Sequence, residues 1–249
     1  MRVRSVGLTD VGRVRKKNED SYLIDDELGL YVVADGMGGH AGGEIASAEA
    51  IDQIHAMIRG ARPAIEALRA SPSDENQRLV RRAVEAAIQA ATYMVFGLAE
   101  QDPARKGMGT TISCMLYVGP LAVVGQVGDS RVYLMRQGAP VQITEDHTLV
   151  NLQLKAGAIT AEQAKVAPYQ NLITRAVGVK DYVEVDTFPV ECRPHDRFIL
   201  CSDGVHGYID NDAEIANMLN SENLEQCGRA LIDNALMRGG KDNCTVVIA

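Results

Sequence analysis

The fold is decided where an apolar strand runs into a glycine-rich turn and a helix, in residues 30–44, LYVVADGMGGHAGGE. A strand, a glycine-rich turn and a helix in this order are the usual setting for a phosphate cradle built from backbone amides. The alternative is a site that uses the side chains of Asp35 and His40. The rest of the chain has to decide between the two.

Composition narrows the class of protein. The 249 residues are 46% hydrophobic, enough for one large domain or two small ones with a substantial core. The net charge of −8 and the pI near 5.2 argue against a nucleic-acid surface, which requires a basic face. No stretch approaches the roughly 20 apolar residues of a membrane span, and the N-terminus alternates like a strand rather than opening a signal peptide. We therefore expect a cytoplasmic protein with no membrane span.

The cysteines are odd in number and widely spaced, without a C-x-x-C pair or nearby histidines. Most lie in or beside apolar runs, where reduced cysteines usually pack. We expect buried thiols and no zinc site at Cys114, Cys192, Cys201, Cys227 and Cys244.

Strand-like runs rich in Val, Ile, Leu and Tyr recur along the chain, and most are joined by short turns. Short turns favour hairpins and hence antiparallel sheets. The expected strands are Val3–Leu8, Ser21–Ile24, Leu30–Ala34, Thr111–Val118, Leu121–Val127, Val132–Met135, Tyr182–Pro189, Arg197–Cys201 and Cys244–Ile248.

Helical patterns interrupt the strands. Apolar stripes predict two long helices, Gly43–Ile58 with Ile45, Ala48, Ile51, Ile54 and Met57, and Glu75–Glu100 with Leu79, Ala83, Ala87, Ala90, Met94 and Leu98. The segment Arg59–Ser71 between them is expected to be a polar connector. Two later helices are predicted at Asp212–Leu219 and Leu224–Arg238. This order indicates an α+β arrangement of sheets covered by helices.

The segment Asp146–Gly178 breaks the hairpin pattern. A capping box beginning at Thr160 predicts a short helix that ends by Pro168. We expect a helical lobe on the surface, and lobes of this kind often border a site.

Five aspartates flank the ends of predicted strands. In antiparallel sheets the end of one strand lies beside the start of the next, so these carboxylates can meet at one rim. Each pair 4 Å apart would repel by roughly 4 kcal/mol at an effective dielectric near 20, so the cluster needs cations. Oxygen ligands alone favour Mg²⁺ or Mn²⁺, and two such ions can activate a water for hydrolysis. The aspartates are Asp20, Asp35, Asp129, Asp203 and Asp242.

Six short motifs, in order, resemble those of the bacterial metal-dependent Ser/Thr protein phosphatases of the PP2C (PPM) family, over nearly the whole chain from Gly7 to Ile248. The motifs are Asn18-Glu19-Asp20, residues 35–44, Gly109-Thr110-Thr111, Gly128-Asp129-Ser130-Arg131, Ser202-Asp203-Gly204 and Asp242-Asn243-Cys244-Thr245.

The resemblance implies one phosphatase domain over residues 1–249, a four-layer α-β-β-α sandwich with a flap at about 146–178. It implies a binuclear Mn²⁺ or Mg²⁺ centre, with Asp35 bridging, the Gly36 carbonyl on one ion, and Asp203 and Asp242 on the other. Asp129 would hold a third, weaker ion together with Asp203. Glu19 and Asp20 would reach the ions mostly through water.

The resemblance also gives two residues a direct part in phosphate chemistry. Arg15 matches the arginine that binds the phosphate, and a guanidinium fork suits paired phosphate oxygens. His40 matches the candidate general acid, a role that typically contributes about 10²–10⁴-fold. His147 falls at the flap entrance, and we assign it no chemistry. The implied substrates are proteins phosphorylated on Ser or Thr, including a cognate Ser/Thr kinase and its substrates.

Other functions fit less well. Gly36-x-Gly38-x-x-Ala41 matches a loose dinucleotide fingerprint, but the polar, proline-interrupted stretch after the helix does not supply the second parallel strand. No Gly-Lys-Ser/Thr P-loop and no Gly-x-Ser-x-Gly elbow is present, and a nuclease would need a basic track. A pseudophosphatase or phosphoprotein-binding scaffold on the same fold is the remaining alternative, although a scaffold has no need for the acid cluster.

Overall fold

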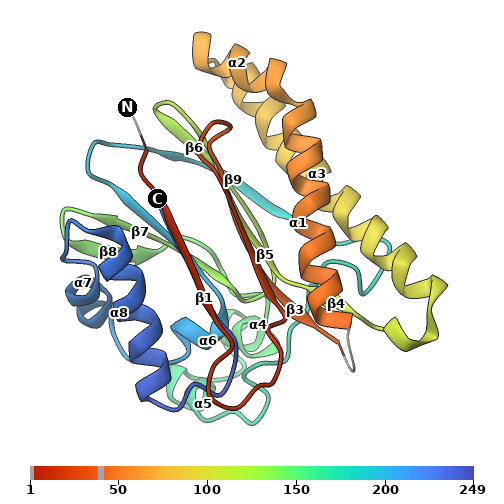
Figure 1. Ribbon diagram of the computed structural model, residues 1–249, viewed down its shortest axis with the longest axis vertical. Coiled ribbons are helices and arrows are strands. Elements are labelled where there is room, and N and C mark those ends of the chain that lie inside the picture. Colours follow the sequence, from red (N-terminus) through yellow and green to blue (C-terminus); the bar gives the residue numbers. More distant parts are fainter. Residues whose placement is uncertain (1–2, 39–41) are drawn as a thin grey trace.

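The computed structural model describes residues 3–38 and 42–249, in which two antiparallel sheets pack face to face (Figure 1). The first sheet has the order β1-β11-β10-β7-β8 and the second has the order β2-β3-β5-β6-β9, with the short β4 paired to β3. The first sheet contains β1 (Val6–Asp10), β11 (Cys244–Ile248), β10 (Arg197–Cys201), β7 (Arg131–Arg136) and β8 (Ala139–Gln142). The second contains β2 (Asp20–Asp25), β3 (Leu30–Met37), β5 (Ile112–Val118), β6 (Leu121–Val127), β9 (Asp186–Glu191) and β4 (Gly109–Thr110).

Helices cover the outer face of each sheet, which completes four layers (Figure 1). The second sheet is covered by α1 (Gly42–Gly60), α2 (Arg62–Ala70) and α3 (Asp74–Gln101), and the first by α7 (Asp212–Met218) and α8 (Leu224–Met237). The remaining helices are the 3-10 turn η1 (Pro103–Arg105), α4 (Leu149–Lys155), α5 (Ala161–Lys165) and α6 (Asp203–His206). The expected α+β sandwich with helices outside is thus confirmed.

Strand periodicity explains why β3 is apolar throughout. Successive side chains point to opposite faces, so Tyr31 and Val33 pack between the sheets while Leu30 and Val32 pack under the helices. Both faces are buried, and the strand therefore lacks the polar alternation of a surface strand. This buried strand is the rigid support that delivers Asp35 to the end of the sandwich.

The buried faces of the two long helices agree only in part with the predicted ones. In α1 the predicted Ile51 and Ile54 are buried, but Ala48 and Met57 are exposed, and Ala50 and Ile58 are buried instead. Buried positions in α3 are Val80, Val84, Ala87, Ile88, Ala91, Thr92, Val95 and Ala99.

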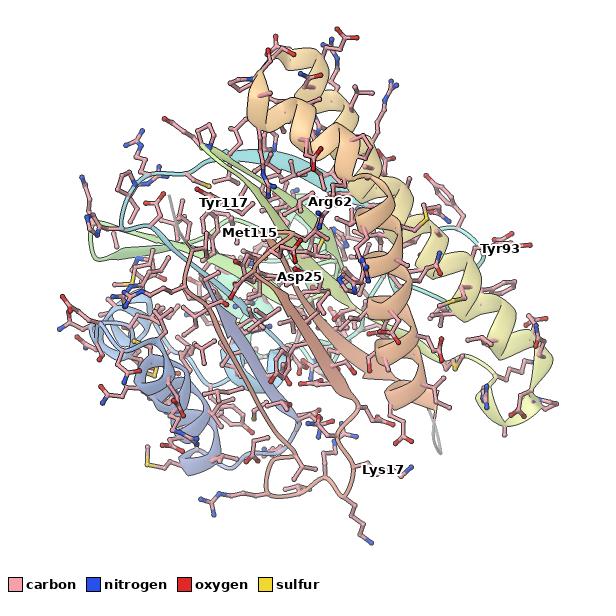
Figure 2. All side chains as sticks on the ribbon, turned by 45° about the horizontal axis from the view of Figure 1, so that its top comes forward. Lys17, Asp25, Arg62, Tyr93, Met115 and Tyr117 are labelled. Atoms are coloured by element: carbon pink, nitrogen blue, oxygen red, sulfur yellow. The ribbon has the colours of Figure 1, made fainter. Side chains whose placement is uncertain are left out.

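Only Ala87 of the predicted stripe on α3 belongs to this buried set, and Leu79 is exposed. Tyr93 points away from the sheets (Figure 2). The helix carries apolar residues on adjacent faces, so their spacing alone did not identify the face that packs.

The polar connector predicted at Arg59–Ser71 was also wrong, because most of it is helix α2. Pro63 stands in its first turn, where the missing N–H is tolerated. Ile65 and Leu68, three residues apart, are fully buried against the core. Two apolar anchors at helical spacing outweigh the charged residues around them.

Smaller differences concern element ends and additional elements. The first strand begins later than Val3–Leu8, and β9 begins and ends later than Tyr182–Pro189. Strand β8 and helices α4 and α6 were not predicted. Helix α5 follows Thr160 with both bonds of the predicted capping box. All five cysteines are buried and unpaired, as expected. Within the described ranges, no helix has the length and apolar character needed to cross a bilayer.

Candidate active site

Asp35 lies near the end of β3, directly opposite Asp20, the first residue of β2. Its backbone is fixed on both sides: its N–H donates to Thr111 Oγ1 (3.0 Å), and its carbonyl accepts from Thr111 N (2.9 Å) and Thr110 Oγ1 (2.9 Å). The central predicted ligand is therefore held by the sheet itself.

Gly36 follows Asp35 at a point where only glycine fits. A Cβ here would clash with the carbonyl oxygens of Gly43 and Glu19. The Gly36 N–H donates to the Glu19 carbonyl (3.1 Å). The glycine thus lets the start of α1 and the segment before β2 approach β3 closely.

Asp203 and Asp242 lie just beyond the adjoining ends of two neighbouring antiparallel strands. Asp203 follows the end of β10 and begins α6, while Asp242 comes just before β11. A Cβ on Gly204 would clash with the carbonyl oxygen of Asn243, so the two segments are in close contact. The end of one strand and the start of its neighbour thus bring the two carboxylates together.

Asn243 joins the loop before β2 to this pair of strands. Its Nδ2 donates to the carbonyls of Val11 (3.0 Å) and Lys17 (2.9 Å), and its Oδ1 accepts from Glu19 N (2.8 Å). No sequence pattern predicted this role for the Asn243 side chain, because these contacts join residues more than 220 positions apart.

Ser202 is a second positioning residue that the sequence did not identify. Its hydroxyl donates to Asp20 Oδ2 (2.8 Å) and accepts from Thr245 N (3.0 Å). It is fully buried between the two sheets' ends, so it orients Asp20 towards the same region as Asp203.

Asp129 follows β6 and is buried. The His206 ring lies behind it, with Nε2 donating to the Asp129 carbonyl (3.0 Å). Burial lowers the pKa of His206 to about 3, so the ring stays neutral. His206 therefore supports the backbone of Asp129 without neutralising its carboxylate.

The predicted acids share an unfavourable electrostatic environment. Burial, followed by the charges of neighbouring aspartates, raises the pKa of Asp20 to about 6 and that of Asp129 to about 7. Burial and four other aspartates hold the pKa of Asp35 well above its usual range. The pKa values of Asp203 and Glu19 are raised mainly by burial. All five aspartates thus interact at one end of the sandwich, as the strand order predicted.

The donor set fits a hard divalent cation. Two buried carboxylate oxygens, Asp20 Oδ1 and Asp203 Oδ1, have no hydrogen-bond partner among the described residues. A buried anionic oxygen is costly unless paired or bound to metal. Across 3–38 and 42–249, no three His, Cys, Asp or Glu side chains form a ready-made ligand set. The fold therefore brings the carboxylate oxygens to one end of the sandwich, but within the described residues they do not form a complete metal-ligand set.

Arg15 extends from the loop before β2 towards the acids. Its Nη2 contacts Asp242 Oδ2 (2.7 Å), and about half of its side chain is exposed. Figure 2 shows Lys17 on the same loop, and its Nζ pairs with Glu44 at 3.1 Å. Arg15 thus contacts a predicted metal ligand directly. His40 lies outside the described residues.

The structure combines an antiparallel sandwich between helical layers with buried acids at one end, the arrangement expected from the resemblance to metal-dependent phosphatases. Residues 13–237 match the family described as Protein phosphatase 2C, and the chain belongs to that family. The family resemblance and the enzyme class expected from the sequence are confirmed.

Related proteins cover nearly the whole chain. It is 35% identical over 244 residues to "Serine/threonine phosphatase stp" of Listeria innocua, covering 96% of this chain and 92% of that protein. The crystal structure of the Mycobacterium tuberculosis serine/threonine phosphatase PstP/Ppp is 35% identical with a TM-score of 0.86, covering 98% and 97%. A structure of the PstP catalytic domain in complex with two manganese ions is 34% identical with a TM-score of 0.81, covering 98% and 96%.

Proposed function

We propose that this chain hydrolyses phosphoserine and phosphothreonine on proteins by direct attack of water on phosphorus, without a phospho-enzyme intermediate. The observation that carries the proposal is the convergence of five aspartates from separate strand ends, with two buried carboxylate oxygens that have no hydrogen-bond partner in the part of the chain that the structure describes. The PstP catalytic domain, 34% identical, holds two manganese ions, which supports a binuclear Mn²⁺ or Mg²⁺ centre here. When bound, two such ions acidify a water and polarise the phosphoryl group.

Seven residues of the chain would hold the metal ions, directly or through water. Asp35, the Gly36 carbonyl, Asp203 and Asp242 would hold the two ions. Asp203 lies close enough to Asp129 for its charge to raise the pKa of Asp129. This proximity supports a third, weaker metal position between the two carboxylates. Glu19 and Asp20 would take part mostly through water.

Arg15 would bind the substrate phosphate. Its contact with Asp242 already places the guanidinium at the acid cluster, and its fork can accept paired phosphate oxygens. By its place in the family motif, His40 would protonate the departing Ser or Thr oxygen. Together these residues would supply a phosphate anchor and a proton donor to the two ends of the breaking bond.

The biological setting follows from the reaction. Substrates phosphorylated on Ser or Thr imply an opposing Ser/Thr kinase, and we propose such a kinase and its targets as partners. Because protein kinases use ATP, we propose a cytoplasmic location, which five unpaired cysteines also suit. We further propose residues 1–249 as one phosphatase domain, with 146–178 as its flap.

Hydrolysis of a phosphothreonine peptide tests the proposal. We expect activity with Mn²⁺, loss on chelation, and loss in Asp203→Asn and Asp242→Asn. Peptide binding should be measured in parallel, because binding without hydrolysis in the wild type would favour a pseudophosphatase scaffold. Activity that survives chelation would contradict the proposed mechanism.

The role of His40 needs a separate comparison. His40→Ala should lower turnover most for the phosphothreonine peptide, whose leaving group has a high pKa, and less for an activated aryl phosphate. Equal losses on both substrates would remove the general-acid role while leaving the metal centre untouched.

A further inference from the structure

The flap, residues 146–178, is joined to the acid cluster through both of its stems. The stems pair with each other, because Thr174 N donates to the His147 carbonyl (2.8 Å). The second stem also exchanges two hydrogen bonds with β4, Thr110 N to Val177 O (3.0 Å) and Val177 N to Thr110 O (2.9 Å). Thr110 in turn supports the Asp35 carbonyl. The flap is therefore anchored to the sheet that carries Asp35.

The first stem reaches the turn that carries Asp129. His147 N donates to the Gly128 carbonyl (2.9 Å), and the His147 ring nitrogen Nδ1 accepts from Gly128 N (3.1 Å). One flap residue thus binds both polar backbone groups of the residue before Asp129. The ring is 6% exposed, so water competes little for these bonds.

The orientation of the His147 ring is fixed from its other side. Nε2 lies 3.0 Å from Asp186 Oδ2 and 3.3 Å from Arg175 Nη1. Arg175 Nη1 donates to Asp186 Oδ1 at the shorter distance of 2.8 Å, which leaves Asp186 Oδ2 to accept from Nε2. Because an amide N–H can only donate, Nδ1 must accept and Nε2 must carry the proton. Burial lowers the pKa of His147, which favours this neutral form. Asp186 therefore selects the tautomer that holds Gly128.

The turn around Asp129 is also restrained by contacts other than those with His147. Gly128 has φ of 100°, and a Cβ there would lie 2.6 Å from the Thr111 side chain. Gln126 Nε2 donates to the carbonyls of Gly128 (3.1 Å) and Ser130 (2.6 Å). The Gly128 and Ser130 carbonyls are thus bound from the sheet, and the Gly128 carbonyl also from His147 N, whereas the Gly128 amide is bound from the flap.

We propose that His147 is a positioning residue that sets the orientation of Asp129 by accepting the Gly128 amide proton. It makes the flap part of the catalytic geometry and not only a cover. The inference rests on the proposed function, since it requires Asp129 to act in hydrolysis. In this role His147 acts through Gly128 and Asp129, and no contact with the substrate is assigned to it.

Two conservative substitutions of His147 distinguish the role of its ring nitrogen Nδ1 from that of Nε2. His147→Asn keeps an acceptor near Nδ1 but cannot reach Asp186, whereas His147→Gln keeps a donor near Nε2 but loses the acceptor for Gly128. We expect His147→Gln to lower kcat by about tenfold, as loss of an outer support of a ligand does. His147→Asn should retain most of the activity. The fall should be equal for an aryl phosphate and a phosphothreonine peptide, with the peptide KM unchanged.

Hydrogen exchange of the Gly128 amide gives a readout independent of activity and of metal. In chelated protein it should quicken by roughly five- to tenfold in His147→Gln, the equivalent of one lost hydrogen bond, and stay near wild type in His147→Asn. Equal exchange in the two variants would overturn the proposal, as would a loss confined to the peptide KM.

Asp186→Ala provides a second route if His147→Gln fails to fold, because Asp186 is partly exposed. It should quicken Gly128 exchange and lower kcat less than His147→Gln does. Glu184→Ala is the matched control, since it breaks the other ion pair of Arg175 (2.7 Å) without touching His147. Equal behaviour of Asp186→Ala and Glu184→Ala would contradict the inference.

A double variant separates this inference from the proposed function. In an Asp129→Asn background, His147→Gln should lower kcat no further, because both changes disable one element. Losses that multiply would overturn the positioning role. If Asp129→Asn is itself fully active, the role of Asp129 fails, while altered Gly128 exchange would still show that His147 holds the turn.

Discussion

Buried acids at the two ends of the sandwich are treated differently. At the end where β10 starts, Asp196 receives two bonds from Arg136 (2.9 and 2.7 Å) and one from Arg193 N (2.7 Å). Its pKa is lowered, since these bonds outweigh the opposing effect of burial. At the end where β10 finishes, Asp203 is buried beside other acids and its pKa is raised. Asp196 is thus paired with a protein cation, whereas at the candidate site, among the described residues, only Asp242 of the five clustered aspartates contacts an arginine, Arg15, and the others are available to another cation.

The largest expected difference is in activity. Asp203→Asn should lower kcat about 10³-fold or more, because several kcal/mol of charge stabilisation is lost. In chelated protein the same variant should unfold at a temperature equal to or above that of wild type, since a buried unpaired charge has been removed. Steady-state kinetics and thermal unfolding check the two halves. A destabilised but active variant would reverse the comparison.

Asp196→Ala should have the opposite profile. Breaking the buried pair should cost about 2–3 kcal/mol of unfolding free energy, less than a fully buried pair because Arg136 can turn towards water. The kcat of the folded protein should not change. Glu191→Ala, which breaks an exposed pair with Arg193 at 3.4 Å, is the control and should cost under about 1 kcal/mol. Denaturant unfolding of both variants gives these values.

A smaller effect that distinguishes the two ends of the sandwich is the pH dependence of the unfolding free energy of the metal-free protein. The folded-state pKa values of Asp20 and Asp129, about 6 and about 7, are above those of unfolded aspartate. Protonation of these two carboxyl groups therefore stabilises the folded protein. This contribution is fully present below the pKa of unfolded aspartate and is lost as the pH rises through 6–7. Chelated protein should therefore lose about 1–3 kcal/mol of stability between pH 5 and pH 8. Asp129→Asn should flatten this slope, and an unchanged slope would contradict the assignment.

The sequence predicted much of the fold because the strands are apolar and the acids stand at their ends. Asp35 and Asp203 could be identified in this way without any contact being known. The buried face of α3 could not, and that of α1 only in part, because Ala-rich helices offer several apolar faces and only the sheet selects one. No sequence pattern predicted the positioning role of His147 either. Its partners, Gly128 and Asp186, meet it only when the flap packs on the sheet.

Calorimetric titration of the chelated protein with Mn²⁺ tests the central claim most directly. Cation binding should displace protons from acids with raised pKa values, so it should release protons near pH 6.5 and tighten as pH rises towards 8. Asp203→Asn combined with Asp242→Asn should abolish it, whereas Asp196→Ala should leave it intact. Binding that releases no protons, or that persists without Asp203 and Asp242, would contradict the account.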